Sequence, residues 1–542
     1  MTKINSTPFK DQKPGTSGLR KKVKHFQQAH YLENFVQSVF NIFDSCKNKT
    51  LVLGGDGRFY NKEAIQIILR MAAANEFKKI IVGQNGLLST PAASLLIRKY
   101  QTDGGIILSA SHNPGGPDAD FGIKFNSANG GPAPEKITEV IYKNSLEISH
   151  YFSCESQAVD ISKIDKIKLQ NTEIEIIDSV IEYADLMESI FDFPIIRSSI
   201  KTGSLHLCFD AMHAVTGPYA KEIFVKRLYA TEDSVINKQP SEDFNGGHPD
   251  PNLAHAEQLL EVMQSNHAPD LGAASDGDGD RNMILGRNFF VTPSDSLAIM
   301  TANAHYIQEY KSGPCGVARS MPTSRAVDIV AEKLGIDCYE TPTGWKYFGN
   351  LLDANKITFC GEESFGSGAD HIREKDGIWA VLFWLNLLAV KKKSVKEIVH
   401  NHWKTFGRHY YERHDFEAID SNLANNVMET LNKKLANLAN QTFDSYVVNN
   451  AYNFSYIDPV DNHTTHNQGI VIEFGTIARV IFRLSGTGTE GATIRVYLEQ
   501  YEHDTELQHQ EVSTYLAPLA KIAMEISEII TITGRSNASV IT

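Results

Sequence analysis

Three aspartates in one short stretch offer the oxygen ligands that a hard divalent cation needs. Asp276, Asp278 and Asp280 alternate with two glycines, and apolar segments flank the stretch on both sides. Glycine between the carboxylates lets the chain curve tightly, so that they can converge on one ion. A calcium-binding EF-hand would have glycine and glutamate where Arg281 and Arg287 stand, with helices on either side. A solvated acidic turn is the alternative, but it leaves three like charges without compensation.

A serine-containing loop precedes the aspartates by more than one hundred and fifty residues. The segment 109–116 (Ser-Ala-Ser-His-Asn-Pro-Gly-Gly) follows an apolar, strand-like run. A turn at a strand end exposes a hydroxyl, so Ser111 is a candidate nucleophile. The G-x-S-x-G sequence of a hydrolase is absent, and His112 is too close in the chain to serve well as the base of a triad. An ordinary polar turn is the alternative.

Two further loops have groups that could hold a phosphorylated sugar. The segment 361–366 (Gly-Glu-Glu-Ser-Phe-Gly) is followed by Lys375, whose amine could move a proton or neutralise a phosphate. The segment 483–495 (Arg-Leu-Ser-Gly-Thr-Gly-Thr-Glu-Gly-Ala-Thr-Ile-Arg) combines glycines, hydroxyls and two arginines, which suits a phosphate nest. It has neither the lysine of a P-loop nor the setting of a dinucleotide fingerprint. A solvated charged loop and a glycine-rich hairpin are the respective alternatives.

The four loops together are more specific than any one of them. Phosphoryl transfer needs an oxygen nucleophile, a metal ion to spread charge, and rigid positioning of the reacting groups. One chain here has a candidate nucleophile, a cation site, a loop for sugar hydroxyls and a phosphate nest. The combination predicts phosphoryl transfer.

The elements that must position these loops follow an alternating strand–helix pattern. Apolar runs of strand length alternate with stretches of helical periodicity up to about residue 393. Beyond that residue the pattern predicts a long polar helix followed by three strands. The pattern predicts the α/β class, with three similar α/β domains that have mixed sheets and a C-terminal α+β domain. Ligand sites of open α/β sheets lie at strand ends, where the first three loops are expected. The predicted domains are 1–178, 179–300, 301–393 and 394–542.

Composition limits the partners of the chain. Its 542 residues have a formal net charge of −13, which disfavours general binding to nucleic acid or to an anionic membrane. The six cysteines include no CxxC pair, so neither a disulfide scaffold nor a cysteine zinc site is expected. The first residues are not a signal peptide, and the apolar run 379–390 is shorter than the about 20 residues that cross a bilayer. We expect a reduced, cytoplasmic, monomeric protein.

The motifs, taken in order, resemble those of the α-D-phosphohexomutases, and within that superfamily the phosphoglucomutase branch typified by the animal muscle enzyme. Besides the four loops, the resemblance includes 11–20 (Asp-Gln-Lys-Pro-Gly-Thr-Ser-Gly-Leu-Arg), 341–346 (Thr-Pro-Thr-Gly-Trp-Lys) and the C-terminal Val-Ile-Thr. It implies a four-domain, heart-shaped fold around a central active-site cleft. It also implies interconversion of α-D-glucose 1-phosphate and glucose 6-phosphate through a phosphoserine, with Mg²⁺ as cofactor and glucose 1,6-bisphosphate as intermediate.

The resemblance also implies roles for individual residues. Ser111 would be the phosphoserine, and one of its oxygens would bind Mg²⁺ together with Asp276, Asp278 and Asp280, of which Asp280 also contacts substrate. Arg20, Arg281 and Lys375 match positions near the reacting phosphate, and Lys124 matches another active-site lysine. The implied catalytic residues are Ser111, His112, Lys124, Lys375 and Arg20. Those implied to hold the sugar are Thr343, Glu362 and Ser364. Those implied to bind the distal phosphate are Ser485, Thr487 and Arg495.

Two other functions fit the same resemblance. One is a mutase that prefers mannose phosphates, although Glu362 and Ser364 favour glucose. The other is a non-catalytic structural homologue, associated with cell adhesion, whose active-site loop is altered. The intact Ser111 and Lys375 favour catalysis. One departure from the pattern is Glu490, which stands in the phosphate loop where a small uncharged residue is common.

Overall fold

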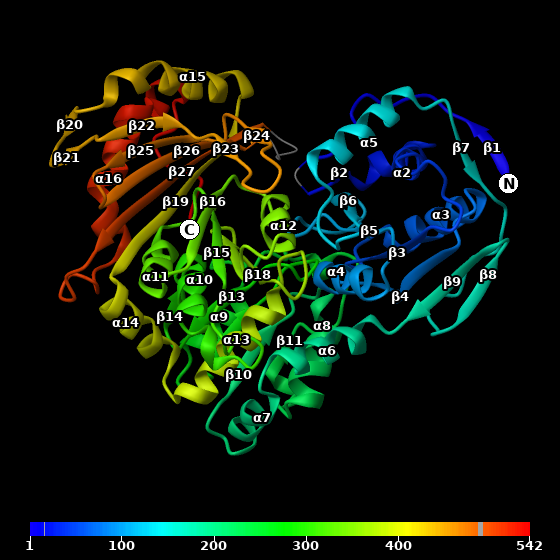
Figure 1. Cartoon of the computed structure of the whole chain (residues 1–542), viewed down its shortest axis with the longest axis horizontal. Coiled ribbons are helices and arrows are strands. Elements are labelled where there is room, and N and C mark those ends of the chain that lie inside the picture. The colour runs from blue at the N-terminus through cyan, green and yellow to red at the C-terminus, as the bar shows by residue number, and fades with distance from the viewer. Residues whose placement is uncertain (16, 486–490) are drawn as a thin grey trace.

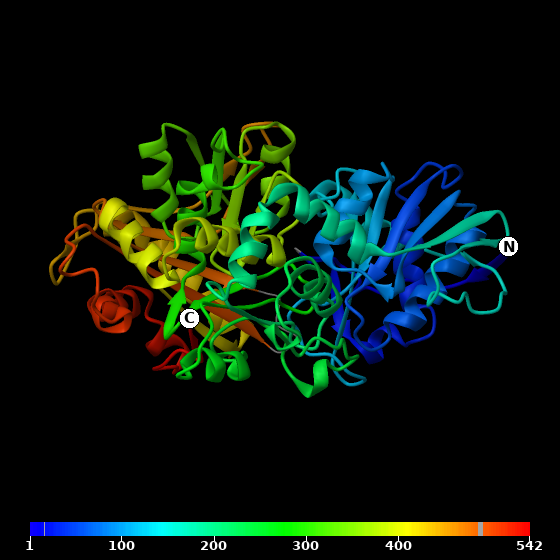
Figure 2. The same cartoon turned by 90° about the horizontal axis from the view of Figure 1, so that it is seen from below.

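The computed structural model describes residues 1–15, 17–485 and 491–542, which form four successive units (Figure 1). The N-terminal unit, blue to cyan, lies at one end of the molecule, and the C-terminal unit, yellow to red, lies at the other. The second and third units, green to yellow, lie between them, and the view from below shows the same order (Figure 2).

The first unit is a mixed sheet of seven strands in the order β2-β6-β5-β3-β4-β9-β8. β3, β4, β5 and β9 run parallel, whereas β6 and β8 are antiparallel to their neighbours. Apolar residues alternate between its faces: Leu51 and Leu53 join one core, and Val52 joins another. Both faces are therefore covered, as is usual for parallel strands. The strands are β2 (Leu19–Lys22), β3 (Thr50–Gly55), β4 (Lys79–Leu87), β5 (Gly104–Leu108), β6 (Asp120–Ser127), β8 (Lys166–Leu169) and β9 (Thr172–Ile177).

Helices flank this sheet, and a small strand pair lies apart from it. Ser89-Thr-Pro in the sequence predicts the start of α4, and the Ser89 side chain accepts a hydrogen bond from the Ala92 amide, with Pro91 in the first turn. The helices are α1 (Val23–Phe26), α2 (Tyr31–Phe40), α3 (Asn61–Ala74), α4 (Thr90–Lys99) and α5 (Glu135–Glu147). The separate pair is β1 (Thr2–Asn5) with β7 (His150–Ser153).

The second and third sheets repeat one plan on a smaller scale. In each, parallel strands come first and an antiparallel strand follows the last of them. The second sheet has the order β11-β10-β12-β13-β14, and the third has β16-β15-β17-β18. Their strands are β10 (Leu207–Asp210), β11 (Val235–Ile236), β12 (Leu271–Ala274), β13 (Met283–Gly286), β14 (Phe289–Val291), β15 (Gly316–Ser320), β16 (Asp337–Thr341), β17 (Phe359–Glu362) and β18 (Gly366–Ala369).

α13 lies in one large core that most helices of these two units share, whereas α9 and α12 pack in smaller clusters. The apolar run 379–390, too short to cross a bilayer, predicts a buried helix, and residues 377–389 of α13 are indeed all buried. The helices are α6 (Ser179–Ile190), α7 (Phe193–Lys201), α8 (Thr216–Ala220) continued by the π-helix η1 (Lys221–Arg227), α9 (Glu257–Gln264), α10 (Pro293–Ala302), α11 (Ala326–Leu334), α12 (Lys346–Asp353), α13 (Gly377–Lys391) and α14 (Val395–Phe406). Short 3₁₀ turns are η2 (Glu232–Ser234), η3 (Phe244–Gly246) and η4 (Ala304–Tyr306).

The C-terminal unit is an antiparallel sheet in the order β22-β25-β26-β27-β19-β28. α15 and α16 pack on one face around Val480 and Val496. Val471 and Ile481, on the other face, pack against Met321 of the third unit. The elements are β19 (Arg408–Ile419), α15 (Ser421–Leu438), β22 (Asn450–Asn453), β25 (Ile470–Phe474), β26 (Ala478–Ser485), β27 (Ala492–Glu502), α16 (Val512–Ser527), α17 (Ile529–Thr533) and β28 (Val540–Ile541), with the pairs β20 (Thr442–Phe443)–β21 (Tyr446–Val447) and β23 (Tyr456–Ile457)–β24 (Thr464–Thr465).

The predicted fold class is confirmed: three α/β units with mixed sheets precede an α+β unit. Two local predictions differ from the structure. Helix-period spacing predicts one helix over 295–310, but α10 ends at Ala302, and the twelve-residue strand β19 was not predicted. The domain boundaries and the central cleft stay predictions, and α10, which the predicted boundary at residue 300 divides, packs against α11 and β17 of the third unit. None of the helices within the described ranges is long and apolar enough to cross a membrane.

Candidate active site

Three of the predicted loops occupy the same position in their sheets. The loops after β5, β12 and β17 each join a parallel strand to its antiparallel neighbour. The aspartate loop is held from both sides: the Thr90 amide donates to the Asp278 carbonyl at 2.9 Å, and the Gly377 amide donates to the Gly279 carbonyl at 3.1 Å. Because the first and third units both bond to it, this loop connects the polar loops of all three α/β units.

Ser111 is fixed in an unusual conformation. Its φ of 53° lies in the left-handed region, which is costly for a residue with a side chain. Its amide donates to Ser109 Oγ at 2.7 Å, and its carbonyl accepts from Arg58 Nη2 at 2.7 Å. The side chain is buried, and Oγ donates to Asp276 Oδ2 at 2.8 Å. The surrounding bonds therefore direct the candidate nucleophile at the aspartate loop.

A buried ion pair supports the serine loop. The side chains of Asp56 and Arg58 are 0% exposed and lie 2.8 Å apart. Arg58 Nη1 also donates to the Asp120 carbonyl at 2.9 Å, while Asp56 Oδ2 accepts from Ser109 Oγ at 2.6 Å. Burial raises the pKa of Asp56, against the pull of Arg58. These two residues were not predicted, although the Gly-Asp-Gly-Arg turn at 55–58, after a strand, was a signal for them.

The three aspartates converge as predicted. One carboxylate oxygen from each lies within 4.8 Å of the others, and all three side chains are buried. Asp276 Oδ1 accepts from the Asp280 and Arg281 amides, each at 3.0 Å. Oδ1 of Asp278 and Oδ1 of Asp280 have no hydrogen-bond partner among the described residues. Convergent oxygens, two of them unpaired and buried, fit a hard divalent cation such as Mg²⁺.

The shifted pKa values of the aspartates also fit a cation site. Burial, together with Asp280 and Asp278, raises the pKa of Asp276 well above its ordinary value. Burial acts in the same direction on Asp278, but Lys124 at 3.3 Å and the Thr90 hydroxyl at 2.6 Å hold the pKa of this carboxyl below its ordinary value. A bound cation would relieve the repulsion that otherwise favours protonation of Asp276.

The predicted cationic residues do surround the triad. Lys124 Nζ lies 3.3 Å from Asp278 Oδ2, and Lys375 Nζ lies 3.3 Å from Asp280 Oδ2. Arg281 follows the triad, and its Nε is 3.9 Å from Asp276 Oδ2. Such a set of positive groups attracts an anionic phosphate.

His112 lies beside Ser111, and nearby arginines shift its pKa. Its Nδ1 is 3.4 Å from Ser111 Oγ. Its pKa is lowered well below the ordinary value by burial, then by Arg281 and Arg20. A neutral ring results at neutral pH, since its positive form would be repelled by its neighbours. Arg20 Nε is buried and has no hydrogen-bond partner in the part of the chain that the structure describes, which leaves it available to an anion.

Glu374 is a functional candidate that the sequence did not single out. Its Oε1 is 3.8 Å from Lys124 Nζ and accepts from Asn126 Nδ2 at 2.9 Å. Burial raises the pKa of Glu374 to about 7, against the pull of Lys124. On Lys124, burial would lower the pKa, but Glu374 and Asp278 outweigh it and the pKa is raised. Glu374 therefore helps to keep Lys124 charged. Its position directly before Lys375 was the one signal in the sequence.

The two segments expected to hold the sugar contact each other. Glu362 is buried, and its Oε1 accepts from the Gly344 amide at 2.8 Å, beside Thr343. The Thr343 hydroxyl is buried and has no hydrogen-bond partner within the described ranges. Ser364 is half-buried in the same loop. The structure brings these residues together, although their roles toward a ligand stay predictions.

The C-terminal loop is described only in part. Thr487 and Glu490 lie outside the described residues. Ser485 is the last residue of β26, and Arg495 lies on β27 with its Nε 3.7 Å from Asp415 Oδ2. Arg495 also contributes to the lowered pKa of His112, so it lies near the serine loop. The C-terminal unit thus adds an arginine to the same region of positive charge.

Comparison with known proteins gives matches along the whole chain. Models of the phosphoglucomutase/phosphomannomutase alpha/beta/alpha domains I, II and III match residues 11–152, 182–288 and 293–406, and a model of the phosphoglucomutase-1 C-terminal domain matches 408–539. A phosphoglucomutase of Rhizobium radiobacter is 55% identical over 539 residues, which cover 99% of each chain. A cytoplasmic phosphoglucomutase of Populus tremula is 50% identical, over 100% of this chain and 99% of its own.

A solved structure shows the same fold. The open form of the exocytosis-sensitive phosphoprotein pp63/parafusin from Paramecium, described as a phosphoglucomutase, superposes with a TM-score of 0.92 at 48% identity. The match covers 100% of this chain and 99% of that one.

Proposed function

The chain belongs to the phosphoglucomutase/phosphomannomutase family, and we propose that it interconverts α-D-glucose 1-phosphate and glucose 6-phosphate. Full-length relatives named phosphoglucomutase, at 50% and 55% identity, support glucose phosphates as substrates over the mannose and non-catalytic alternatives. The observation that carries the proposal is the Ser111 hydroxyl, 2.8 Å from Asp276 within the aspartate triad.

Ser111 carries the phosphoryl group in this proposal. In the first half-reaction, phosphoserine 111 gives its phosphoryl group to O6 of glucose 1-phosphate, so the P–Oγ bond breaks and a P–O6 bond forms. In the second, Ser111 Oγ attacks the 1-phosphate of the resulting glucose 1,6-bisphosphate and glucose 6-phosphate leaves. In the first half, the proton that O6 loses is balanced by the proton that the freed Ser111 Oγ takes up. In the second, the proton that Ser111 Oγ loses is balanced by the proton that O1 of the departing glucose 6-phosphate takes up.

The aspartate triad fits the cofactor. Asp276, Asp278 and Asp280 would hold Mg²⁺ together with an oxygen of phosphoserine 111, and the two unpaired Oδ1 atoms support that assignment. Bound there, Mg²⁺ would offset charge on the transferring phosphoryl group. Lys124, whose ammonium contacts Asp278, stands beside the same carboxylates.

The remaining residues bind and orient the substrate. We propose that Arg20, Arg281 and Lys375 balance the charge of the reacting phosphate, with His112 neutral beside Ser111. The buried, unpaired Arg20 Nε and Thr343 hydroxyl support ligand binding at these positions. The residues proposed to hold the sugar are Thr343, Glu362 and Ser364, with Asp280 contacting substrate from the triad. Those proposed to anchor the phosphate that is not reacting are Ser485, Thr487 and Arg495.

The proposal extends to partners and location. We propose a cytoplasmic monomer whose partners are sugar phosphates and that binds neither nucleic acid nor membrane. The net charge of −13 supports the exclusion of polyanions, and cytoplasmic relatives support the location, although chloroplastic relatives are equally similar.

A coupled assay tests the activity. Glucose 1-phosphate is supplied with Mg²⁺ and a trace of glucose 1,6-bisphosphate, and glucose 6-phosphate is followed through a dehydrogenase. We expect turnover that a chelator stops, and a larger kcat/KM for glucose 1-phosphate than for mannose 1-phosphate. Absence of glucose 6-phosphate would contradict the proposal, and a preference for the mannose substrate would correct its specificity.

A further inference from the structure

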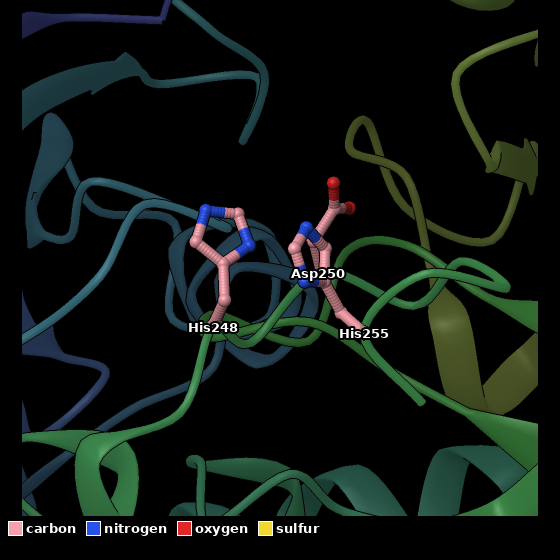
Figure 3. Close-up of side chains that lie close together, drawn as sticks. All are labelled: His248, Asp250 and His255. Atoms are coloured by element: carbon pink, nitrogen blue, oxygen red, sulfur yellow. The ribbon is translucent and has the colours of Figure 1, made fainter. Parts of the chain in front are cut away.

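A second cluster of metal-ligating side chains lies beside the aspartate triad. His248, Asp250 and His255 each place one ligand atom within 4.8 Å of the other two. Their side chains approach one another from a single loop (Figure 3), between η3 and α9. The rings of His248 and His255 have centroids 4.2 Å apart. None of the residues proposed for catalysis belongs to this cluster.

The loop that holds the cluster is internally braced. Prolines at 249 and 251 fix the backbone around Asp250. Asn252 Nδ2 donates to Asp250 Oδ2 at 2.9 Å, and Asn252 Oδ1 accepts from the His255 amide at 3.1 Å. One side chain thus fixes the carboxylate and the backbone of the second histidine, so little ordering is needed on binding.

One ligand atom of the cluster, His248 Nδ1, is available to a metal ion. His248 Nδ1 is buried and has no hydrogen-bond partner in the described part of the chain, an arrangement that is uncommon for a polar atom. An uncharged imidazole nitrogen is the form that coordinates metals.

We propose that His248, Asp250 and His255 form a site for Zn²⁺. Two imidazoles and one carboxylate suit zinc and its neighbours in the first transition row, whereas Mg²⁺ prefers oxygen ligands alone. Zinc commonly takes three such protein ligands and keeps its fourth position for water or substrate. With bonds of about 2.0–2.1 Å, tetrahedral ligands lie about 3.4 Å apart, which rotation of exposed His255 brings within reach.

The two metal sites offer different ligand atoms and should therefore bind different metal ions. The triad offers three carboxylates and the oxygen of Ser111, a hard site. The histidine cluster offers two nitrogens and one oxygen, which favours zinc by ligand type. Excess Mg²⁺ should therefore occupy the triad while leaving the cluster free for zinc.

Zinc at this site would act on the catalytic region through Arg281. Asp250 Oδ1 now accepts from Arg281 Nη1 at 3.2 Å, and its other oxygen is already bonded to Asn252. A metal ion that takes Asp250 Oδ1 removes this partner and places its own positive charge near Arg281. The ring of His248 is also 6.3 Å from that of His112, beside Ser111. Zinc should therefore inhibit turnover, a consequence that rests on the proposed function, whereas zinc binding does not.

Binding is measured on the full chain with Zn²⁺ in a large excess of Mg²⁺, by competition with a chromogenic chelator. The test variant is His255→Ala, because this exposed residue has no role in the proposed reaction. His267→Ala is the matched control, since His267 is an exposed histidine of the same unit. We expect His255→Ala to weaken zinc binding at least about tenfold, the lower end of the loss on removing a single supporting group, and His267→Ala to leave it unchanged. Co²⁺ in place of zinc should give the visible absorption of a four-coordinate ion in the control only.

Three results would overturn the site: equal zinc affinity in both histidine variants, loss of zinc binding in Asp278→Asn but not in His255→Ala, or no zinc bound while Mg²⁺ is in excess.

The effect of zinc on activity is measured separately. Zinc should lower kcat/KM of the His267→Ala enzyme in Mg²⁺, and His255→Ala should escape this inhibition at the same zinc concentration. Equal inhibition of the two variants would contradict the coupling through Asp250. Absence of mutase activity without zinc would refute the proposed function and leave the binding result standing.

Discussion

Arg58 offers a sharp test of how the serine loop is held. The change is Arg58→Met, which keeps the length of the side chain and removes its charge and its donors. In the protein, the guanidinium pairs with Asp56 where both side chains are fully buried, and it donates to the carbonyls of Ser111 and Asp120. Methionine would leave the Asp56 carboxylate buried without its cation and both carbonyls without this donor.

The expected loss of stability is large. Breaking a buried ion pair by removing one partner costs about 3–5 kcal/mol. A domain of the size predicted for the first unit loses about 2–4 °C in Tm per kcal/mol, so its transition should fall by about 6–20 °C. Arg58→Lys retains the charge but not the planar guanidinium that reaches both carbonyls. Its transition temperature should therefore lie between those of the wild type and of Arg58→Met. Activity should fall with stability, because the Ser111 conformation depends on Arg58.

The assay is calorimetry of the full chain, following the transition in which the first unit unfolds, with kcat measured below it. Arg287→Met is the matched control: its ion pair with Asp270 spans 3.0 Å, but the arginine is 60% exposed. Exposed pairs contribute about 0–1 kcal/mol, so its transition should move by less than about 4 °C. If Arg58→Met is as stable and as active as Arg287→Met, the idea that this ion pair supports the serine loop is wrong.

Three further changes test the site. Ser111→Ala should abolish turnover while calorimetry shows an intact fold, and ordinary activity in this variant would move the phosphoryl carrier elsewhere. Asp278→Asn should lower kcat and weaken the dependence of the rate on Mg²⁺ together; an unchanged metal titration would contradict the ligand assignment. Glu374→Gln tests the raised pKa. Because the folded pKa of about 7 exceeds the ordinary 4.5, the stability that Glu374 contributes is present below about pH 4.5 and lost as pH rises through 7. The free energy of unfolding is measured in urea with a chelator present. As pH rises from 4.5 to 8, the stability of the variant relative to the wild type should increase by about 3 kcal/mol. If the free energies of unfolding of the two proteins change in parallel with pH, Glu374 does not titrate in this range.

The sequence predicted the fold where local pattern decides structure. The apolar strand over 51–55 and the Ser89-Thr-Pro start of α4 follow from residue type and spacing alone. β19 was missed because its twelve residues mix charged and aromatic side chains without a continuous apolar run. Its pairing with β27, about eighty residues later, stabilises it as a strand. Such distant pairing leaves no local signal.

The sequence predicted which residue types form the site, but it did not predict the residues that hold them in place. The convergence of Asp276, Asp278 and Asp280 followed from their spacing with glycine. Arg58 and Glu374 were missed, because their importance comes from burial and from partners distant in the chain. Charge and polarity in a sequence do not reveal whether a residue is buried, and burial is what makes these two groups matter.

Whether Ser111 carries the phosphoryl group is tested most directly by the intact mass of the protein. The chain is incubated with glucose 1,6-bisphosphate and Mg²⁺, freed of small molecules, and weighed beside Ser111→Ala. We expect a gain of one phosphoryl group on the wild type, mapped to Ser111 and lost on incubation with a large excess of glucose 1-phosphate and Mg²⁺ as glucose 1,6-bisphosphate is released, and no gain on the variant. An unphosphorylated wild type that still forms glucose 6-phosphate, or a phosphoryl group on the variant, would contradict it.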